Sequence, residues 1–328
     1  MQFQARHFDP ALRGQPLDGE RSVCKFDVLP PSTYVYDRRL VLAVNVALAT
    51  QRPLLLAGEP GCGKTTLARN VALVLGWAYY EATIASRSQA SDLLWQLDAL
   101  GRLNDAYDPK AAVEAEACYV EPGPLWWALA PDSARRRGLA EDAPRAKSHP
   151  VPVPPGHSDQ ATGAVLLIDE IDKAEPDVPN DLLEVLDTRR FHVKAQTVEP
   201  ERKKILIAIT TNLERELPGA FLRRCVVYRF PDAGAGWFSG IAQQRWPALD
   251  AALAHDVEAR LLQYRQLAKD RGERKPGTAE YLDAVRALAE LGVAERPAGV
   301  VGDEADAALA WTQVERAVFV KPLAADGA

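Results

Sequence analysis

The sequence has 328 residues, 47% of them hydrophobic and 26% charged, with a formal net charge of −6. This length can bury a full core and predicts two unequal domains, since one domain usually takes about 100–200 residues. The acidic balance argues against a protein that coats nucleic acid and leaves room only for a local basic patch.

Two further observations bear on where the protein works. No stretch reaches the about 20 apolar residues that span a bilayer, and the first ten residues lack the apolar centre of a signal peptide. The four cysteines (Cys24, Cys62, Cys118 and Cys225) are scattered without the spacing of a zinc site or a disulfide scaffold. We therefore expect a reduced protein of the cytoplasm with no membrane span.

The first elements along the chain are an arm, a helix and a buried strand. Residues 1–33 contain several prolines and glycines and little periodicity, which predicts an N-terminal arm. Apolar residues at helical spacing predict a helix over 34–50. The short run 54–57 is entirely apolar, as is typical of a strand buried on both faces of a parallel sheet. A second helix is predicted over 65–75.

A phosphate-binding loop lies between this strand and this helix. The segment fits GxxxxGK[ST] at every fixed position and consists of Gly58, Glu59, Pro60, Gly61, Cys62, Gly63, Lys64 and Thr65, followed by Thr66. Glycines let successive backbone N–H groups point at phosphate oxygens, the lysine reaches the outer phosphates, and the threonine hydroxyl ligates Mg²⁺. The alternative is a glycine-rich turn that matches by accident. The strand before it and the helix after it favour the nucleotide site.

The middle of the chain combines a tryptophan pair with a proline-rich segment. Trp126 and Trp127 either belong to the core or face a pore or substrate, and adjacent aromatics favour the core. Residues 131–163 contain six prolines and predict a mobile inserted loop. The run Arg135 to Arg137 within it suggests nucleic acid, but a solvated loop is the simpler interpretation.

An acid pair ends the next buried strand, predicted over 164–168. Asp169 is a candidate magnesium ligand, and Glu170 can polarise a water for attack on the γ-phosphorus. An ordinary strand that ends in a polar loop is the alternative, and the phosphate loop earlier in the chain favours the acid pair.

Two more candidates follow later strands. After the strand predicted over 205–210 comes Asn212, which can hydrogen-bond the attacking water or can simply cap a turn. Arg223 and Arg224 precede another apolar run, 226–228. An arginine there can reach a neighbouring subunit's nucleotide and stabilise the transferring phosphoryl group. Surface arginines in solvent are the alternative.

Strands that alternate with helices predict an α/β fold, with a parallel sheet covered on both faces. A helical segment is predicted at 181–187. From about residue 234 only helices are predicted: one around 257–267, one over 278–291 with Thr278 as its N-cap, and one over 303–318. We predict an α/β ATPase core over 34–233 and a small helical lid domain over 234–328.

The order of these elements resembles the AAA+ superfamily, and within it the MoxR-type ATPases. The resemblance is carried by residues 58–65, 119–125, 166–187 and 209–225 and covers roughly residues 34–325. It implies ATP and Mg²⁺ as cofactors, Lys64 and Thr65 on phosphate and metal, Asp169 and Glu170 on metal and water, Asn212 as sensor 1, and Arg224, with Arg223 second, as the arginine finger. MoxR-type proteins are generally hexameric ATPases that act as chaperones, often with a von Willebrand A domain partner. Some related forms belong to prokaryotic conflict systems.

Three features depart from that pattern. Lys64 and Asp169 are 105 residues apart, which is long for the class. Ala279 stands where the sensor-2 arginine is expected, so Lys275 or Arg274 takes that role or the role is absent. No aromatic pore loop can be assigned.

The expected function is ATP hydrolysis by a ring of identical subunits, coupled to the remodelling of a partner protein. A slow nucleotide-dependent assembly switch is the second hypothesis, and the intact acid pair favours hydrolysis over it. A nucleic-acid motor or loader is the third, which the acidic balance opposes. A kinase would need an acceptor site and gives Asn212 and Arg224 no role.

Overall fold

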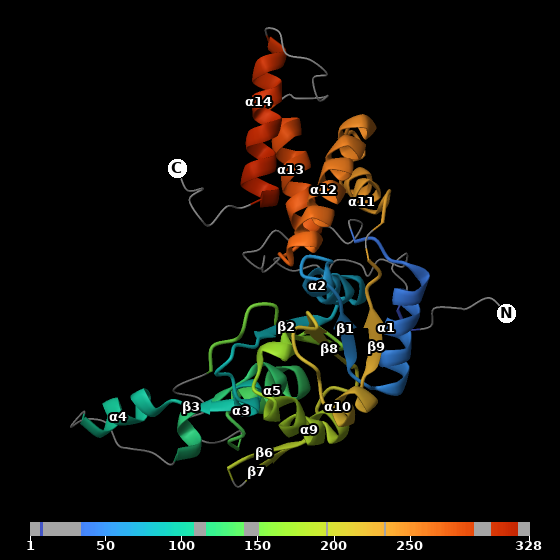
Figure 1. Ribbon diagram of the computed structural model, residues 1–328. Helices are drawn as coiled ribbons and strands as arrows, with labels where there is room; N and C mark the ends of the chain where they lie inside the picture. The colour runs from blue at the N-terminus through green and yellow to red at the C-terminus, as the bar shows by residue number, and fades with distance from the viewer. Residues whose placement is uncertain are drawn as a thin grey trace, which may run out of the picture. The chain divides into compact units, whose positions relative to one another are not determined.

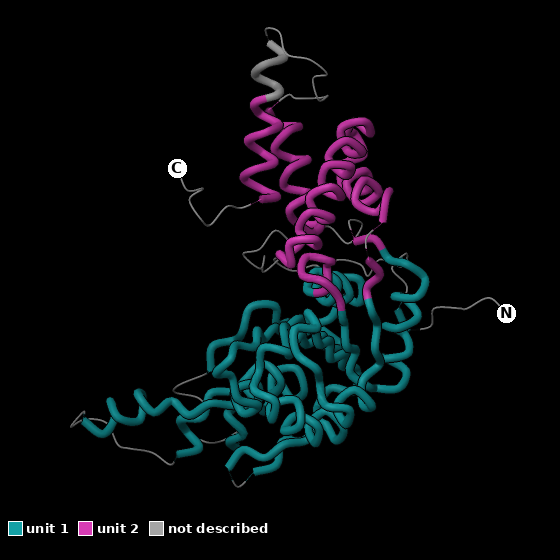
Figure 2. Tube along the Cα trace, in the orientation of Figure 1, with its two compact units in different colours: residues 1–31, 36–57, 65–229 teal, residues 32–35, 58–64, 230–328 magenta. Residues whose placement is uncertain are grey.

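The computed structural model describes residues 7–8, 34–107, 116–140, 151–194, 196–232, 234–291 and 303–320. The chain divides into two units, which Figure 2 distinguishes by colour. The first consists of Met1–Pro31, Tyr36–Ala57 and Thr65–Arg229, and the second of Ser32–Val35, Gly58–Lys64 and Phe230–Ala328. The predicted arm over 1–33 lies, apart from residues 7–8, outside the described residues.

A five-stranded parallel sheet forms the centre of the first unit (Figure 1). Its order is β2-β5-β8-β1-β9, with β1 at Leu54–Ala57, β2 at Ala78–Thr83, β5 at Ala164–Asp169, β8 at Ile205–Thr211 and β9 at Val226–Arg229. All four neighbouring pairs are parallel. The apolar runs of β1, β5 and β8 are buried almost throughout, as expected for strands covered on both faces. The predicted α/β fold is confirmed.

Helices and two small pairs of antiparallel strands make up the rest of the first unit. The helices are α1 (Arg38–Thr50), α2 (Lys64–Leu75), α3 (Ala90–Leu94), α4 (Ala99–Tyr107), α5 (Pro124–Leu129), α6 (Pro131–Arg135), α8 (Asp177–Asp181), α9 (Leu183–Thr188) and α10 (Gly219–Arg224). Strands β3 (Trp95–Leu97) and β4 (Val120–Pro122) form an antiparallel pair, and β6 (Phe191–Val193) and β7 (Gln196–Val198) form a hairpin. The helix predicted over 34–50 begins only at Arg38, because the Asp37 carboxylate caps it by accepting from the Leu40 N–H at 2.7 Å.

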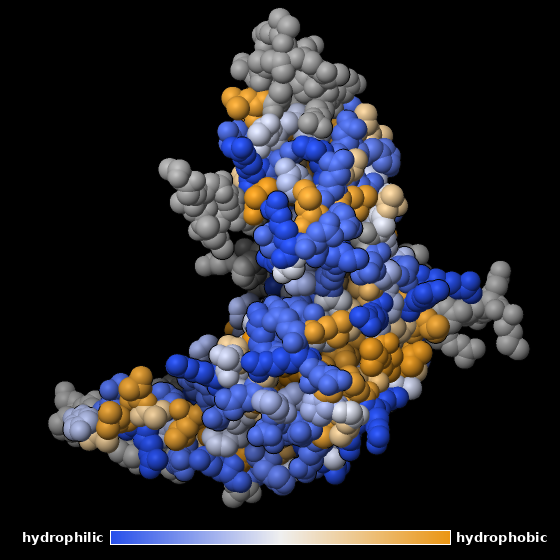
Figure 3. Space-filling model, viewed as in Figure 1, coloured by the Kyte–Doolittle hydropathy of each residue, from blue (hydrophilic) through white to orange (hydrophobic). Residues whose placement is uncertain are grey.

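The segment between β2 and β5 both adds to the core and exposes an apolar helix. Trp126 and Trp127 lie on α5 with 0% and 3% of their surfaces exposed, so the core interpretation is confirmed. Helix α4, in contrast, has no buried residue, and it exposes Leu100 and Leu103 by 73% and 50%. Figure 3 shows apolar surface over the region of α4.

The inserted loop predicted over 131–163 is wrong for residues 131–135, which form a helix, whereas residues 136–140 and 151–163 contain no helix or strand. Residues 131–135 form α6, whose N-terminal N–H groups at Asp132 and Ser133 donate to the Glu201 carboxylate at 2.9 Å each. Proline at the first helical position is compatible with this start. Farther along, the buried His157 ring bonds the Tyr80 hydroxyl at 2.6 Å. Glu201 and Tyr80 lie far from this segment in the sequence, so local pattern could not predict these contacts. Residues 141–150 of the predicted loop lie outside the described residues.

Helices dominate the second unit. They are α11 (Trp237–Arg245), α12 (Ala251–Arg271), α13 (Thr278–Glu290) and α14 (Asp303–Glu315), followed by a π-helical turn, Arg316–Val320. Their shared core includes Phe238, Val257, Leu261, Tyr281 and Val285. None of the described helices is both long and apolar enough to cross a bilayer.

The predicted N-cap of α13 is wrong by one residue. Gly277 is the cap and Thr278 the first helical residue. The Glu280 carboxylate turns back and accepts from the Gly277 N–H at 3.0 Å. A glutamate at the third helical position can accept a hydrogen bond from the backbone N–H of the N-cap residue, so no threonine cap is needed.

Candidate functional site

The phosphate loop is curled around its own lysine. Within the second unit, Lys64 Nζ donates to the carbonyl oxygens of Gly58 and Glu59 at 2.7 and 2.9 Å, and the lysine is only 7% exposed. Gly61 and Gly63 have φ angles of +79° and +94°, backbone angles that residues with a Cβ rarely adopt. These backbone angles are what the glycines of the motif supply.

Two oxygen-bearing side chains that could hold a metal ion lie together in the first unit. Thr65, in the first turn of α2, places its Oγ1 3.0 Å from Oδ2 of Asp169, the last residue of β5. The buried Thr210 of β8 donates to Asp169 Oδ1 at 2.5 Å and fixes the carboxylate. One hydroxyl and one carboxylate oxygen suit Mg²⁺, which takes one or two protein carboxylates plus phosphate and water oxygens. The residues present therefore fit the ion that the sequence predicts.

The predicted water-activating pair is also brought together. Glu170 Oε1 accepts from the Asn212 side-chain amide at 3.3 Å, while Oε2 accepts from Lys173 Nζ at 2.5 Å. The hydrogen bond from Lys173 raises the pKa of that lysine. Glu170 itself has a φ of +60°, an uncommon value for a residue other than glycine, and its N–H donates to Thr210 Oγ1 at 2.8 Å.

Sequence reasoning missed Asp172, the buried carboxylate beneath this pair. Asp172 is 2% exposed, and its Oδ2 accepts from the backbone N–H groups of Asn212 and Glu214, each at 3.0 Å. Its other oxygen has no partner in the described part of the chain. The carboxylate fixes the backbone after β8 and thereby the position of Asn212. Its place as the next acid after Asp169 and Glu170 was the available signal.

The two candidate arginines, Arg223 and Arg224, are the last two residues of α10. Arg224 forms an ion pair with Asp187, whereas the Arg223 side chain is exposed. Arg52 binds the helix end, donating to the carbonyls of Arg223, of Arg224 at 3.0 Å and of Cys225 at 3.1 Å. Sequence reasoning missed Arg52, because its partners are more than 170 residues away.

Arg224 lies far from Asp169 of its own chain. The strand register places Val226 level with Leu167, three strands apart in the sheet. Arg224 lies two residues before the first and Asp169 two residues after the second. Strand spacing and rise separate the backbones of Val226 and Asp169 by about 16 Å, and Arg224 comes before Val226, at the end of the sheet opposite to Asp169. Arg224 instead lines a cavity of about 340 Å³ together with Arg52 and Arg189.

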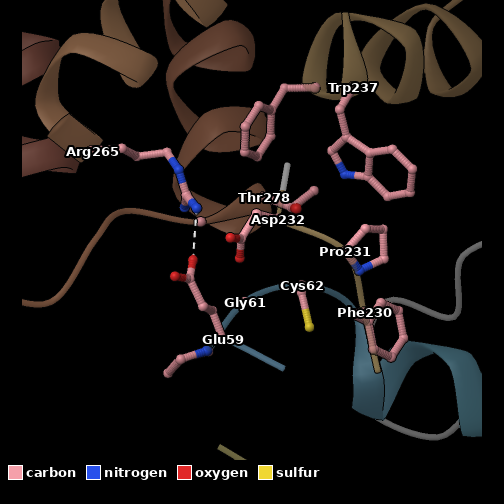
Figure 4. Close-up of a pocket in the computed structure, with 12 residues that line it drawn as sticks. Glu59, Gly61, Cys62, Phe230, Pro231, Asp232, Trp237, Arg265 and Thr278 are labelled. Atoms are coloured by element: carbon pink, nitrogen blue, oxygen red, sulfur yellow. Dashed lines mark hydrogen bonds and ion pairs between the residues drawn. The ribbon is translucent and has the colours of Figure 1, made fainter. Parts of the chain in front are cut away.

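Charged residues of the second unit contact the phosphate loop. Lys275 Nζ bonds Glu59 Oε1 at 2.5 Å, and Arg274 bonds Glu280 at 3.0 Å, so of the two proposed substitutes for sensor 2 only Lys275 contacts the loop. Arg265 of α12, which sequence reasoning missed, bonds Glu59 Oε2 at 2.6 Å (Figure 4). Cys62 lies on the loop with its Sγ 3.9 Å from Lys64 Nζ.

Comparison with known proteins gives one family match and a set of similar folds. The family described as "AAA domain (dynein-related subfamily)" matches residues 53–225. No curated protein matches the chain. Among solved structures, a mutant of RuvB from Thermotoga maritima aligns at 15% identity with a TM-score of 0.45, covering 87% of this chain and 73% of its own. The Thermotoga maritima RuvB Holliday junction branch migration motor aligns at 15% identity with a TM-score of 0.41, covering 85% and 67%. At this level the structural likenesses carry no argument about function.

Proposed function

The chain belongs to the AAA domain family, dynein-related subfamily, whose match covers more than half of its length, and on that premise we propose that it hydrolyses Mg-ATP as a ring of subunits and thereby remodels a partner protein. Its fold is that of an AAA+ P-loop NTPase with C-terminal helices, and the family is one of nucleotide-binding ATPases. The particular residues, the ring and the partner belong to the proposal.

The observation that carries the proposal is the geometry at the end of β5. Thr65 and Asp169 present two oxygens to one position, 3.0 Å apart, and Thr210 holds the carboxylate in place. A magnesium ion bound there would neutralise charge on the phosphates. Lys64, adjacent to Thr65 in the loop motif, is assigned to the outer phosphates.

Glu170 and Asn212 are proposed to handle the water. The Glu170 carboxylate accepts the proton of the attacking water, and the Asn212 amide, already 3.3 Å from that carboxylate, orients the pair. Asp172 holds Asn212 through the backbone.

Arg224 is proposed to act on the nucleotide of a neighbouring subunit. The separation of about 16 Å between Val226, which follows Arg224 at the start of β9, and Asp169 of the same chain supports this assignment, because an arginine side chain does not span it. An arginine that completes the site of the next subunit makes hydrolysis depend on assembly. In systems that use such an arginine, it raises the rate of hydrolysis by about 10³–10⁵. The sequence resemblance suggests that this assembly is a cytoplasmic hexamer of the MoxR type. Its partner would be a von Willebrand A domain protein.

A protein partner is favoured over a nucleic acid by two features. The net charge of −6 opposes binding to phosphate backbones. Helix α4 exposes Leu100 and Leu103, which suit an apolar partner better than a nucleic acid.

A slow assembly switch is the second candidate, and the contact between Lys173 and Glu170 favours it. At 2.5 Å the lysine occupies one oxygen of the carboxylate that must accept a proton. Steady-state turnover of wild type beside Glu170→Gln separates the two functions. A remodelling ATPase loses its turnover in the variant, whereas a switch shows little difference.

The proposal is tested by size-exclusion chromatography with light scattering, with and without Mg-ATP, combined with phosphate release. We expect wild type to gain mass with Mg-ATP and to release phosphate. Arg224→Ala should bind nucleotide and release none, and Arg286→Ala, which removes an exposed arginine of α13, serves as the matched control. Normal turnover in Arg224→Ala would overturn the shared site.

A further inference from the structure

Backbone contacts join the phosphate loop to the start of α13 in the second unit. The Thr278 N–H donates to the Gly61 carbonyl at 3.2 Å. A Cβ on Gly277 would lie 3.0 Å from the Pro60 carbonyl oxygen, so glycine permits this close approach. The lid residues 275–278 therefore lie directly on the loop that is assigned to phosphate.

Glu59 is the charged centre of this contact. Its carboxylate accepts from Arg265 at 2.6 Å and from Lys275 at 2.5 Å, and Figure 4 shows the first of these bonds. Burial would raise the pKa of Glu59, but the hydrogen bonds from Lys275 and Arg265 outweigh it and lower the pKa. In the described part of the chain, Glu59 is the acidic partner of both cations.

Arg265 is held in place by more than its charge. Its side chain is 12% exposed, donates to the Pro276 carbonyl at 2.6 Å, and lies 5.7 Å from the ring centre of Phe238. A guanidinium in this position is aimed at the loop rather than at solvent.

The space beside the Glu59–Arg265 pair is nearly filled. The cavity lined by Glu59, Gly61, Cys62, Asp232, Trp237 and Arg265 has a volume of about 20 Å³. This is room for one water. A phosphate group does not fit in a volume of this size.

We propose that Arg265 and Lys275 are polyphosphate-binding residues of the lid and that Glu59 occupies them as an internal competitor until a nucleoside polyphosphate displaces it. The inference rests on the proposed function, because it requires nucleotide at the phosphate loop. Arginine and lysine bind carboxylates and phosphates through the same charge-assisted hydrogen bonds. A polyphosphate carries more negative charge than one carboxylate, so the exchange favours the ligand.

The test measures the affinity of the full chain for Mg²⁺ with β,γ-imido-ATP by isothermal titration calorimetry. Glu59→Gln keeps the shape of the side chain and removes its charge. We expect it to tighten binding about three- to tenfold, the range for two partly exposed ion pairs. Arg265→Met with Lys275→Met should weaken binding by a similar factor. Glu290→Gln, which removes the exposed Arg286–Glu290 pair of α13, is the matched control and should change nothing.

The combined variant decides between competition and simple repulsion. In the Arg265→Met, Lys275→Met background, Glu59→Gln should no longer tighten binding, because no cation remains to be released. A gain that persists there, or unchanged or weaker binding in Glu59→Gln alone with a normal circular dichroism spectrum, overturns the inference. If wild type and Lys64→Ala both fail to bind the nucleotide, the proposed function itself fails and the inference with it.

Discussion

Replacing Asp172 tests whether one buried carboxylate sets the position of Asn212. Asp172 lies in the 3₁₀ turn Ile171–Lys173, and a single oxygen accepts both N–H groups of the backbone that follows β8. We expect a variant without the Asp172 carboxylate to lose stability and hydrolysis together, because the same two hydrogen bonds serve both.

The magnitude follows from those two bonds. Asp172→Ala leaves two N–H donors without an acceptor, at about 1–3 kcal/mol each, so the free energy of unfolding should fall by about 2–6 kcal/mol. Asp172→Asn can turn its amide oxygen toward the same donors. Bonds to a neutral acceptor are about half as strong as those to a charged one, so the loss should be about 1–3 kcal/mol.

Urea unfolding and phosphate release provide the assay. We expect wild type, Asp172→Asn and Asp172→Ala to rank in that order in both measurements. Asp250→Ala is the control: it removes the exposed cap of α12, whose carboxylate accepts from the Ala252 N–H at 2.9 Å. It should cost about 1 kcal/mol and leave turnover unchanged. If Asp172→Ala behaves like Asp250→Ala in both assays, the reasoning is refuted.

Three further predictions address other parts of the chain. Glu170→Gln should lower turnover at least about 100-fold while nucleotide binding persists in calorimetry; equal turnover would remove Glu170 as the base. Arg52→Met should lower the free energy of unfolding by about 1–2 kcal/mol and reduce turnover as Arg224→Ala does, because it frees three carbonyls at the end of α10; a variant with normal melting and turnover would contradict this. Burial lowers the pKa of His157, so the folded state favours the neutral ring, and the stability this contributes is present above pH 6.5 and lost as the pH falls through the lowered pKa. Urea unfolding at pH 7.5 and 5.5 should show a smaller acid loss in His157→Gln than in wild type; equal losses would rule the histidine out.

The sequence predicted the strands and motifs that depend only on residues close together along the chain. The apolar runs predicted β1, β5 and β8 because strands buried on both faces need side chains of one kind. The loop motif and the acid pair placed Thr65 after β1 and Asp169 at the end of β5, and the carboxyl ends of parallel strands meet at one edge of the sheet.

The remainder depended on partners far away in sequence. Arg265 contacts Glu59 across 206 positions, and Arg52 contacts the end of α10 across more than 170. No periodicity encodes such pairs. Likewise, α6 was mistaken for a loop because its cap, Glu201, comes 69 positions after Asp132.

Phosphate release from Mg-ATP by wild type, Asp169→Asn and Lys64→Ala is the most direct test of the central claim. Asp169→Asn removes the charge opposite the Thr65 hydroxyl and leaves its hydrogen bonds nearly intact. We predict steady release by wild type and none above background by either variant. Equal release by wild type and Asp169→Asn, or no nucleotide-dependent signal from wild type, would contradict the account.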